Sequence, residues 1–205
     1  GCVEFVVTPY AYSLASVYSD TEAAEQLQAQ QAQVKQLLGV ESTTACLSEL
    51  LYSDEIAIRL HKMGFKAVMT EGAKHILSWK SPNYVYSSSA APKLKVLLRN
   101  TSLSDELAFH FSDPAWHNFP MEAEKFANIL TELPEEEQVV NIWVGAETFG
   151  LRQSATTGIF DFLKALPYYA LEQSMGFMTP GEVAKKIATK DAVVVPYPLT
   201  WAGEA

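Results

Sequence analysis

The stretch that most constrains the fold is residues 139–150, Val-Val-Asn-Ile-Trp-Val-Gly-Ala-Glu-Thr-Phe-Gly. Its first six residues are mostly apolar and β-branched, which predicts a strand buried on both faces. A polar loop follows, and residues 157–166 predict a helix. In α/β folds, the residues just past the carboxyl end of such a strand carry the chemistry. Glu147 therefore stands where a functional carboxylate would stand, whereas Gly145, the first residue after the strand, offers no functional group.

Strands and helices alternate along the whole chain, without an internal repeat or a linker. Residues 74–91 are predicted to form a long connection or a small insertion. The alternation predicts a parallel sheet with helices outside it. Six or seven strand candidates favour an incomplete βα barrel over a short open sheet, with residues 1–205 as one domain. The strand candidates are residues 3–8, 42–47, 65–70, 95–99, 139–144, 177–179 and 192–195, and the helix candidates are residues 20–38, 54–63, 104–110, 121–130 and 157–166.

The composition is that of a globular protein with a full core, since 48% of the 205 residues are hydrophobic and 19% are charged. The net charge of -9 argues against a nucleic-acid partner and against an anionic membrane surface. No apolar run approaches the roughly 20 residues that span a bilayer. The sequence gives no indication of the oligomeric state.

Two cysteines, Cys2 and Cys46, form neither a disulfide framework nor a CxxC pair. Their scarcity favours a reducing compartment and predicts a cytoplasmic location. The chain starts Gly-Cys-Val-Glu, without Met, directly in a predicted strand. We therefore expect it to be a fragment of a longer barrel.

Charged side chains stand at the ends of several predicted strands. Glu49 and Glu71 each follow a strand, and Arg99 ends another, with Asp105 close behind it. Carboxylates accept hydrogen bonds from hydroxyl groups and flat rings stack on sugars, so carboxylates and aromatic residues together favour carbohydrate binding. Two carboxyl groups about 5–5.5 Å apart would permit a retaining glycosidase mechanism. A helix cap or a solvated loop residue is the open alternative for each carboxylate. The aromatic residues of these loops are Tyr10, Tyr12, Trp79, Tyr84, Trp116, Tyr197 and Trp201, whereas Trp143 and Phe162 are expected in the core.

Signatures of other chemistries are absent from the sequence. It contains no GxGxxG after a strand, no GxxxxGK[ST], no HExxH and no GxSxG. The histidines His61, His75, His110 and His117 lack the spacing of metal ligands. We expect neither a cofactor nor a metal.

Several segments together resemble glycoside hydrolase family 57, the α-amylase and 4-α-glucanotransferase family, and most of all its α-amylase-like branch. The resemblance runs along nearly the whole chain. It implies a seven-stranded incomplete βα barrel that acts on α-glucans or maltooligosaccharides with retention. The family's amino-terminal His-Gln-Pro motif is absent, so the first strand or strands of the barrel are expected to be missing. The segments that carry the resemblance are residues 3–5, 13–15, 48–50, 52–57, 63–66, 70–73, 81–86, 97–100, 103–105, 147–150, 157–160, 196–198 and 200–202.

The resemblance also implies roles for single residues. Glu49 matches the family nucleophile. The family's acid/base is the Asp of Asp-Tyr-Glu-Thr-Phe-Gly, and this Asp reads Gly145 here, with Glu147 as a candidate substitute two residues on. The residues implied in substrate binding are Tyr12, Glu71, Trp79, Arg99, Asp105 and Trp201.

Further polar positions of the family motifs are changed in this chain. Where the family usually has a His, this chain has Tyr12, and where it has Asn-Thr before the nucleophile, this chain has Leu47-Ser48. A second family His is replaced by Tyr197, and a family Asp is replaced by Gly203. Their joint loss predicts a catalytically degenerate member with weak or no hydrolysis. The alternative is a non-catalytic carbohydrate-binding or regulatory protein. A polysaccharide deacetylase, a third reading, needs an Asp and His metal cluster that the sequence lacks.

Overall fold

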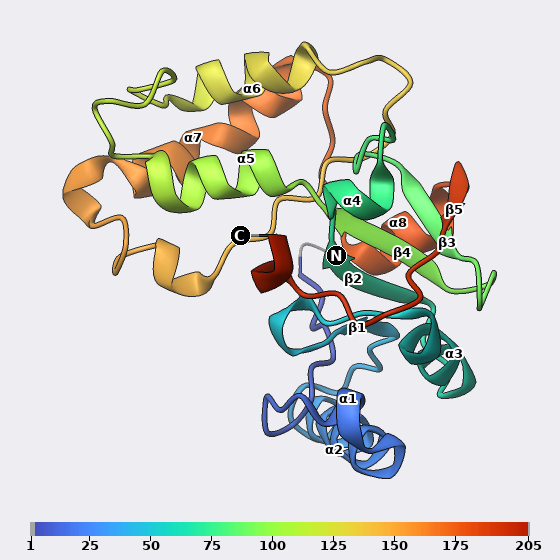
Figure 1. The fold of residues 1–205 in the computed structure, drawn as a ribbon. Helices are drawn as coiled ribbons and strands as arrows, with labels where there is room; N and C mark the ends of the chain where they lie inside the picture. Colours follow the sequence, from blue (N-terminus) through green and yellow to red (C-terminus); the bar gives the residue numbers. More distant parts are fainter. Residues whose placement is uncertain (1–2, 205) are drawn as a thin grey trace. The chain divides into compact units, whose positions relative to one another are not determined.

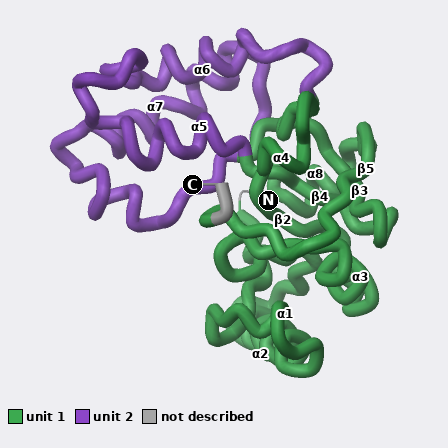
Figure 2. The backbone as a smooth tube through the Cα atoms, in the orientation of Figure 1, with its two compact units in different colours: residues 1–99, 138–141, 178–205 green, residues 100–137, 142–177 purple. Residues whose placement is uncertain are grey.

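The computed structural model describes residues 3–204, which divide into two compact units (Figures 1 and 2). Unit 1 comprises residues 1–99, 138–141 and 178–205, and unit 2 comprises residues 100–137 and 142–177. The one barrel domain expected over residues 1–205 stays a prediction. Cys2 and the side-chain surroundings at Gly203 lie outside the described part.

Unit 1 is built on a sheet with the strand order β1-β2-β4-β3-β5 (Figure 1). β1 pairs with β2 and β2 with β4 in parallel, as the alternation of strands and helices predicts. β3 runs antiparallel to β4 and parallel to β5, so the sheet is mixed and its two edges do not join. The strands are β1 (Thr44–Cys46), β2 (Ala67–Glu71), β3 (Val85–Ser88), β4 (Lys95–Arg99) and β5 (Asp191–Val193).

The helices of unit 1 begin and end at local signals. The Ser19 and Ser53 hydroxyls accept the N–H groups of the third helical residues of α2 and α3, and Gly39 ends α2 with a φ of 69°. Thr179 and Glu182 form a capping box at the start of α8, where Pro180 is the first helical residue. The helices are α1 (Ala15–Tyr18), α2 (Asp20–Leu38), α3 (Asp54–Lys62), α4 (Lys74–Leu77) and α8 (Pro180–Lys186).

The core of unit 1 is one continuous apolar cluster around the sheet. Every residue of β2 is buried, as expected of a strand with a neighbour on each side and helices over its faces. Phe65 and Leu60 are almost fully buried in this cluster. Burial of one such side chain contributes about 1.5–3 kcal/mol.

Unit 2 is helical and contains α5 (Thr101–Asp105), α6 (Ala123–Thr131) and α7 (Ile159–Glu172), with a π-helical turn at Glu106–His110. The Phe162 ring packs edge-on against Phe126 and Phe111, at centroid distances of 5.6 and 5.3 Å. Phe162 is therefore a core residue, as predicted. Trp143 is only half-buried, and its predicted place in the core was wrong.

The strand predicted at residues 139–144 does not form. Only Asn141 makes a strand-like bridge, with Arg99. The backbone N–H groups on either side of it bond to groups that belong to no strand: Gln138 and Val139 donate to the Asn83 carbonyl, and Trp143 donates to the Ser104 hydroxyl. A β-ladder would need these backbone N–H groups, so residues 139–144 stay irregular and half-buried.

Two further strand predictions were wrong. Of residues 3–8, only Val7 is paired, with Ala45. Residues 177–179 form no strand. Conversely, the predicted connection 74–91 contains β3, whose Tyr-Ser-Ser segment has little of the apolar signal that marks a buried strand.

Glu4 joins three parts of unit 1 through its carboxylate. One oxygen accepts the Thr44 hydroxyl at 2.6 Å, and the other accepts the Gly181 N–H at 2.6 Å, in the first turn of α8. We predict that Glu4→Ala lowers the free energy of unfolding by about 2 kcal/mol, because two hydrogen bonds to a charged, half-buried group are lost. Urea denaturation measures the change, with exposed Glu25→Ala as the control. Equal stability of the two variants would contradict this role.

Candidate functional site

Glu49 lies in a short turn directly after β1, in unit 1. Its φ and ψ are 57° and 26°, and Leu50 also has a positive φ of 55°. Such backbone angles are costly for residues other than glycine and are concentrated at functional sites. The turn is closed by the Leu50 N–H, which donates to the Leu47 carbonyl at 3.0 Å. The turn sets the direction in which the Glu49 side chain leaves the end of β1.

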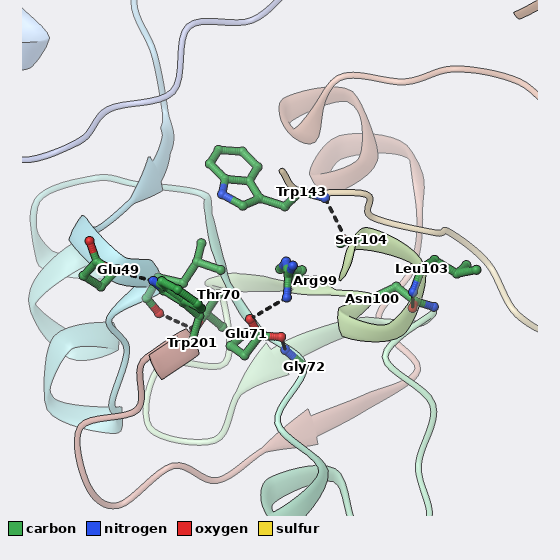
Figure 3. A network of polar contacts seen from close by, with 11 residues as sticks. Glu49, Thr70, Glu71, Gly72, Arg99, Asn100, Leu103, Ser104, Trp143 and Trp201 are labelled. Atoms are coloured by element: carbon green, nitrogen blue, oxygen red, sulfur yellow. Dashed lines mark hydrogen bonds and ion pairs between the residues drawn. The ribbon is translucent and has the colours of Figure 1, made fainter. Parts of the chain in front are cut away.

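Both carboxylate oxygens of Glu49 accept a hydrogen bond. The Tyr12 hydroxyl donates to Oε1 at 3.4 Å. The Trp201 indole Nε1–H donates to Oε2 (Figure 3). Partial burial raises the pKa of the Tyr12 phenol, which keeps it a neutral donor. Tyr12 and Trp201 are 62% and 44% exposed, so this group of three side chains is open to a ligand.

Trp201 is held in place by the backbone just before it. The N–H groups of Tyr52 and Leu199 donate to each other's carbonyl groups, at 2.9 and 2.8 Å. This bridge fastens the carboxyl-terminal segment beside the residues that follow Glu49. The backbone bridge between Tyr52 and Leu199 therefore positions Trp201 for its contact with Glu49.

Glu71 and Arg99 form a buried ion pair at the ends of β2 and β4 (Figure 3). The two residues face each other in the strand register, and Arg99 Nη1 lies 3.1 Å from Glu71 Oε2. The Gly72 N–H donates to the other oxygen at 3.0 Å. A Cβ at Gly72 would overlap the Arg99 carbonyl, so only glycine fits there. Because Glu71 is 1% and Arg99 8% exposed, their predicted contact with substrate stays a prediction.

The remaining predicted binding residues lie apart from these contacts in the chain. Trp79 follows α4 in unit 1 and is 87% exposed. Asp105 is the last residue of α5 in unit 2 and is half-buried. Their substrate contacts also stay predictions.

Gly145 and Glu147 belong to one short loop of unit 2, in which Ala146–Thr148 form a 3₁₀ turn. The Glu147 carboxylate lies so close to the Gly145 Cα that a Cβ on residue 145 would overlap it. Arg152 Nη2 lies 3.4 Å from Glu147 Oε1, and its guanidinium lies 5.0 Å from the centre of the Phe109 ring. Sequence reasoning missed Arg152, because nothing in the sequence distinguishes it from a solvated loop cation.

The described residues offer neither a metal-binding cluster nor a membrane-spanning helix. In the part of the chain that the structure describes, no group of three or more His, Cys, Asp or Glu side chains is placed to hold a metal ion. Among those same residues, no helix has the length and the apolar content that a membrane span requires.

Comparison with known proteins decides the family. The model of glycosyl hydrolase family 57 matches residues 1–196. The chain belongs to this family.

Relatives within family 57 include a protein of Methanocaldococcus jannaschii named "Putative alpha-amylase", which is 36% identical over 197 residues. The match covers 95% of this chain and 41% of that protein. The fold is similar to the 4-alpha-glucanotransferase from Thermococcus litoralis, with a TM-score of 0.76 at 15% identity, over 97% of this chain and 31% of the other. It is also similar to the GH57-type branching enzyme from Pyrococcus horikoshii, with a TM-score of 0.77 at 15% identity, over 98% of this chain and 48% of the other. The chain thus spans less than half the length of these relatives.

The family 57 match and the structural likenesses confirm the predicted family and the predicted fold class, an incomplete βα barrel. The mixed, unclosed sheet of unit 1 fits a partial barrel. Glu49 and Gly145, where the resemblance predicts the nucleophile and the lost acid/base, belong to different units, and both roles stay predictions. Of the residues predicted for the site, the structure gathers Tyr12 and Trp201 around Glu49.

Proposed function

We propose that this family 57 chain binds α-glucan or maltooligosaccharide, and that Glu49 is the nucleophile of a retaining glycosyl transfer whose acid step is impaired. The observation that carries the proposal is the Glu49 carboxylate, directed by a left-handed turn and oriented by Tyr12 and Trp201. Two neutral hydrogen-bond donors fix the orientation of the Glu49 carboxylate, and the exposure of these donors leaves the carboxylate accessible to substrate.

In the first step, the Glu49 carboxylate attacks the anomeric carbon, and the bond from that carbon to the leaving oxygen breaks. The leaving oxygen keeps the bonding electron pair and needs a proton. Gly145 offers none, and general acid help is typically worth about 10²–10⁴-fold in rate. A sugar alkoxide is therefore expected to leave slowly, whereas an acidic phenol leaves without such help.

The exposed rings beside Glu49 support sugar binding. Trp201 and Tyr12 present flat apolar faces, and their polar atoms are directed at the carboxylate. Tyr197, in the same carboxyl-terminal segment, is 50% exposed and stacks nearly parallel with His75, at 11° between the rings and 6.2 Å between their centres. Neutral sugars suit such a mixture of rings and acceptors, and they also suit a chain with a net charge of -9.

A second candidate function is a non-catalytic carbohydrate-binding protein. It is favoured by the same hydrogen bonds, since Tyr12 and Trp201 already occupy both Glu49 oxygens. In this alternative, Glu49 only accepts hydrogen bonds and never attacks carbon. Both candidates share the binding step and differ in turnover.

Calorimetric titration with maltoheptaose tests the shared binding step. We predict saturable binding, weakened about tenfold or more by Trp201→Ala, which corresponds to about 1.4 kcal/mol of lost ring and indole contacts. Tyr168→Ala is the control, since Tyr168 is also an exposed aromatic residue, at 60% exposure, but belongs to α7 and not to the group around Glu49. The absence of heat at high ligand concentration would contradict both candidate functions.

A further inference from the structure

The turn that carries Glu49 has an unfavourable backbone conformation. Glu49 and Leu50 both have a positive φ, of 57° and 55°, and neither is glycine. Such residues raise the energy of the folded state and persist only where the surrounding contacts hold them there. The direction of the Glu49 side chain therefore depends on the contacts that hold these two residues.

Two of these contacts lie within the turn itself. The Leu50 N–H donates to the Leu47 carbonyl at 3.0 Å. The Leu51 N–H donates to the Ser48 carbonyl at 3.1 Å. Both are i→i+3 bonds of the kind that every 3₁₀ turn makes. They close the turn, but they do not connect it to the sheet.

A third contact comes from β2, elsewhere in unit 1. The Thr70 hydroxyl donates to the Leu50 carbonyl at 2.8 Å, across 20 residues of sequence. β1 ends at Cys46, which is paired with Met69, so Thr70 is the next residue of β2 beyond the last pair. Thr70 is 1% exposed, and its backbone is fixed by the pairing with β4, opposite Leu98. The sheet thus presents a buried donor of fixed position to the turn.

We propose that Thr70 is a positioning residue for Glu49, because its hydroxyl holds the left-handed turn that directs the carboxylate to its two donors. The inference rests on the proposed function of Glu49 and adds a residue that acts only through Glu49. Figure 3 draws Thr70 together with Glu49 and Trp201. A buried hydrogen bond and the cost of one left-handed residue are of similar size. Loss of the Thr70 bond therefore shifts the balance between this turn and less strained conformations.

The ends of the turn are held separately from its middle. Leu47 and Leu51 are each 2% exposed and belong to the apolar core of unit 1, whereas Glu49 is half-buried. The core contacts of these two leucines do not involve the Thr70 hydroxyl. Removal of that hydroxyl is therefore expected to reorient Glu49 while the core of unit 1 is retained.

Thr70→Val is the decisive variant, because it removes the donor and keeps a β-branched side chain that suits a buried strand. We expect the indole N–H resonance of Trp201 in a ¹H–¹⁵N spectrum to move toward its position in Glu49→Ala, which lacks the acceptor. The chain has four Trp residues, and a spectrum of Trp201→Phe identifies the resonance. Thr70→Ser keeps the hydroxyl and should leave the resonance at its wild-type position.

Turnover of 4-nitrophenyl α-maltoside is the second readout. Thr70→Val should lower kcat by at least about tenfold and change KM by less than about twofold, because the geometry of attack changes while the rings that contact the sugar remain. Thr70→Ser should restore kcat. A hydroxyl with a merely structural role would lower the temperature of unfolding and leave kcat unchanged.

Ser88→Ala is the matched control. The Ser88 hydroxyl is also buried in the sheet and accepts the Ala91 N–H at 3.2 Å, away from the Glu49 turn. Its loss should lower stability without moving the Trp201 resonance. If Thr70→Val does not fold, Thr70→Ala and Thr70→Ser give the same comparison, since they differ only in the hydroxyl.

The outcomes separate this inference from the proposed function. An unmoved Trp201 resonance in Thr70→Val, or an unchanged kcat beside an active wild type, would overturn the role of Thr70 and leave the proposed function standing. Wild-type protein without turnover would overturn the catalytic form of the proposed function. The Trp201 resonance would then still decide whether Thr70 orients Glu49, because it reports the contact directly.

Discussion

Replacement of Glu49 by Gln is expected to abolish release of 4-nitrophenol from 4-nitrophenyl α-maltoside, with a fall of at least about 10³-fold in kcat/KM. The phenol leaves without proton transfer, so the assay isolates attack by the nucleophile. The amide carries no negative charge and cannot form the glycosyl ester. The amide oxygen can still accept the Trp201 N–H, and the amide NH₂ can donate to the Tyr12 hydroxyl oxygen, so the variant removes the nucleophile and keeps both neighbours. Steady-state rates of the two proteins measure the effect.

Tyr12→Phe is the matched variant for this measurement. It removes one 3.4 Å hydrogen bond to Glu49 and keeps the carboxylate and the ring, so the expected loss in kcat/KM is less than about tenfold. Equal turnover by wild type and Glu49→Gln would mean that another group attacks carbon. Binding of maltoheptaose without turnover by any of the proteins would select the non-catalytic alternative.

Helices were predictable from the sequence because their signals are local. Gly39 ends α2, Pro180 begins α8, and the apolar spacing of Ile56 and Leu60 marks the buried face of α3. Each signal acts within one or two turns of its own helix. The first residue of a helix is harder to predict than its existence, since neighbouring polar residues compete for the same N–H groups. Ser19 caps α2 and Asn100 caps α5.

Strands were harder to predict, because a strand exists only where another backbone pairs with it. Residues 139–144 carry a strong strand pattern, yet the Asn83 carbonyl and the Ser104 hydroxyl take the N–H groups that a ladder would use. β3 has a weak pattern and forms because β4 and β5 offer both of its edges a partner. No window of the sequence contains that information.

The same limit applies to the candidate site. The resemblance to family 57 identified Glu49 by position, and the structure adds its partners, Tyr12 at 37 and Trp201 at 152 residues' separation. Contacts over such distances are set by the fold and not by any local motif. The sequence predicted Gly145 as a lost acid and Glu147 as a candidate substitute, and the structure adds that the Glu147 carboxylate lies where a Cβ on residue 145 would project.

Removal of the Arg99 side chain is expected to cause the largest loss of stability among these variants. Arg99→Met takes away the guanidinium that is paired with Glu71, whose carboxylate is 1% exposed. Taking one partner from a buried ion pair typically costs about 3–5 kcal/mol, because the other charge stays desolvated. Urea denaturation followed by circular dichroism measures the change in the free energy of unfolding.

The double variant Arg99→Met with Glu71→Leu separates the two explanations for such a loss. If the cost comes from an unpaired buried charge, apolar replacement of both residues should recover most of the stability, since the desolvation of both charges is avoided. If the pair instead holds the ends of β2 and β4 in register through the bonds to Gly72 and Arg99, the double variant should be as unstable as Arg99→Met alone. We expect recovery, because five consecutive residue pairs already fix the register of these two strands without any side-chain contact.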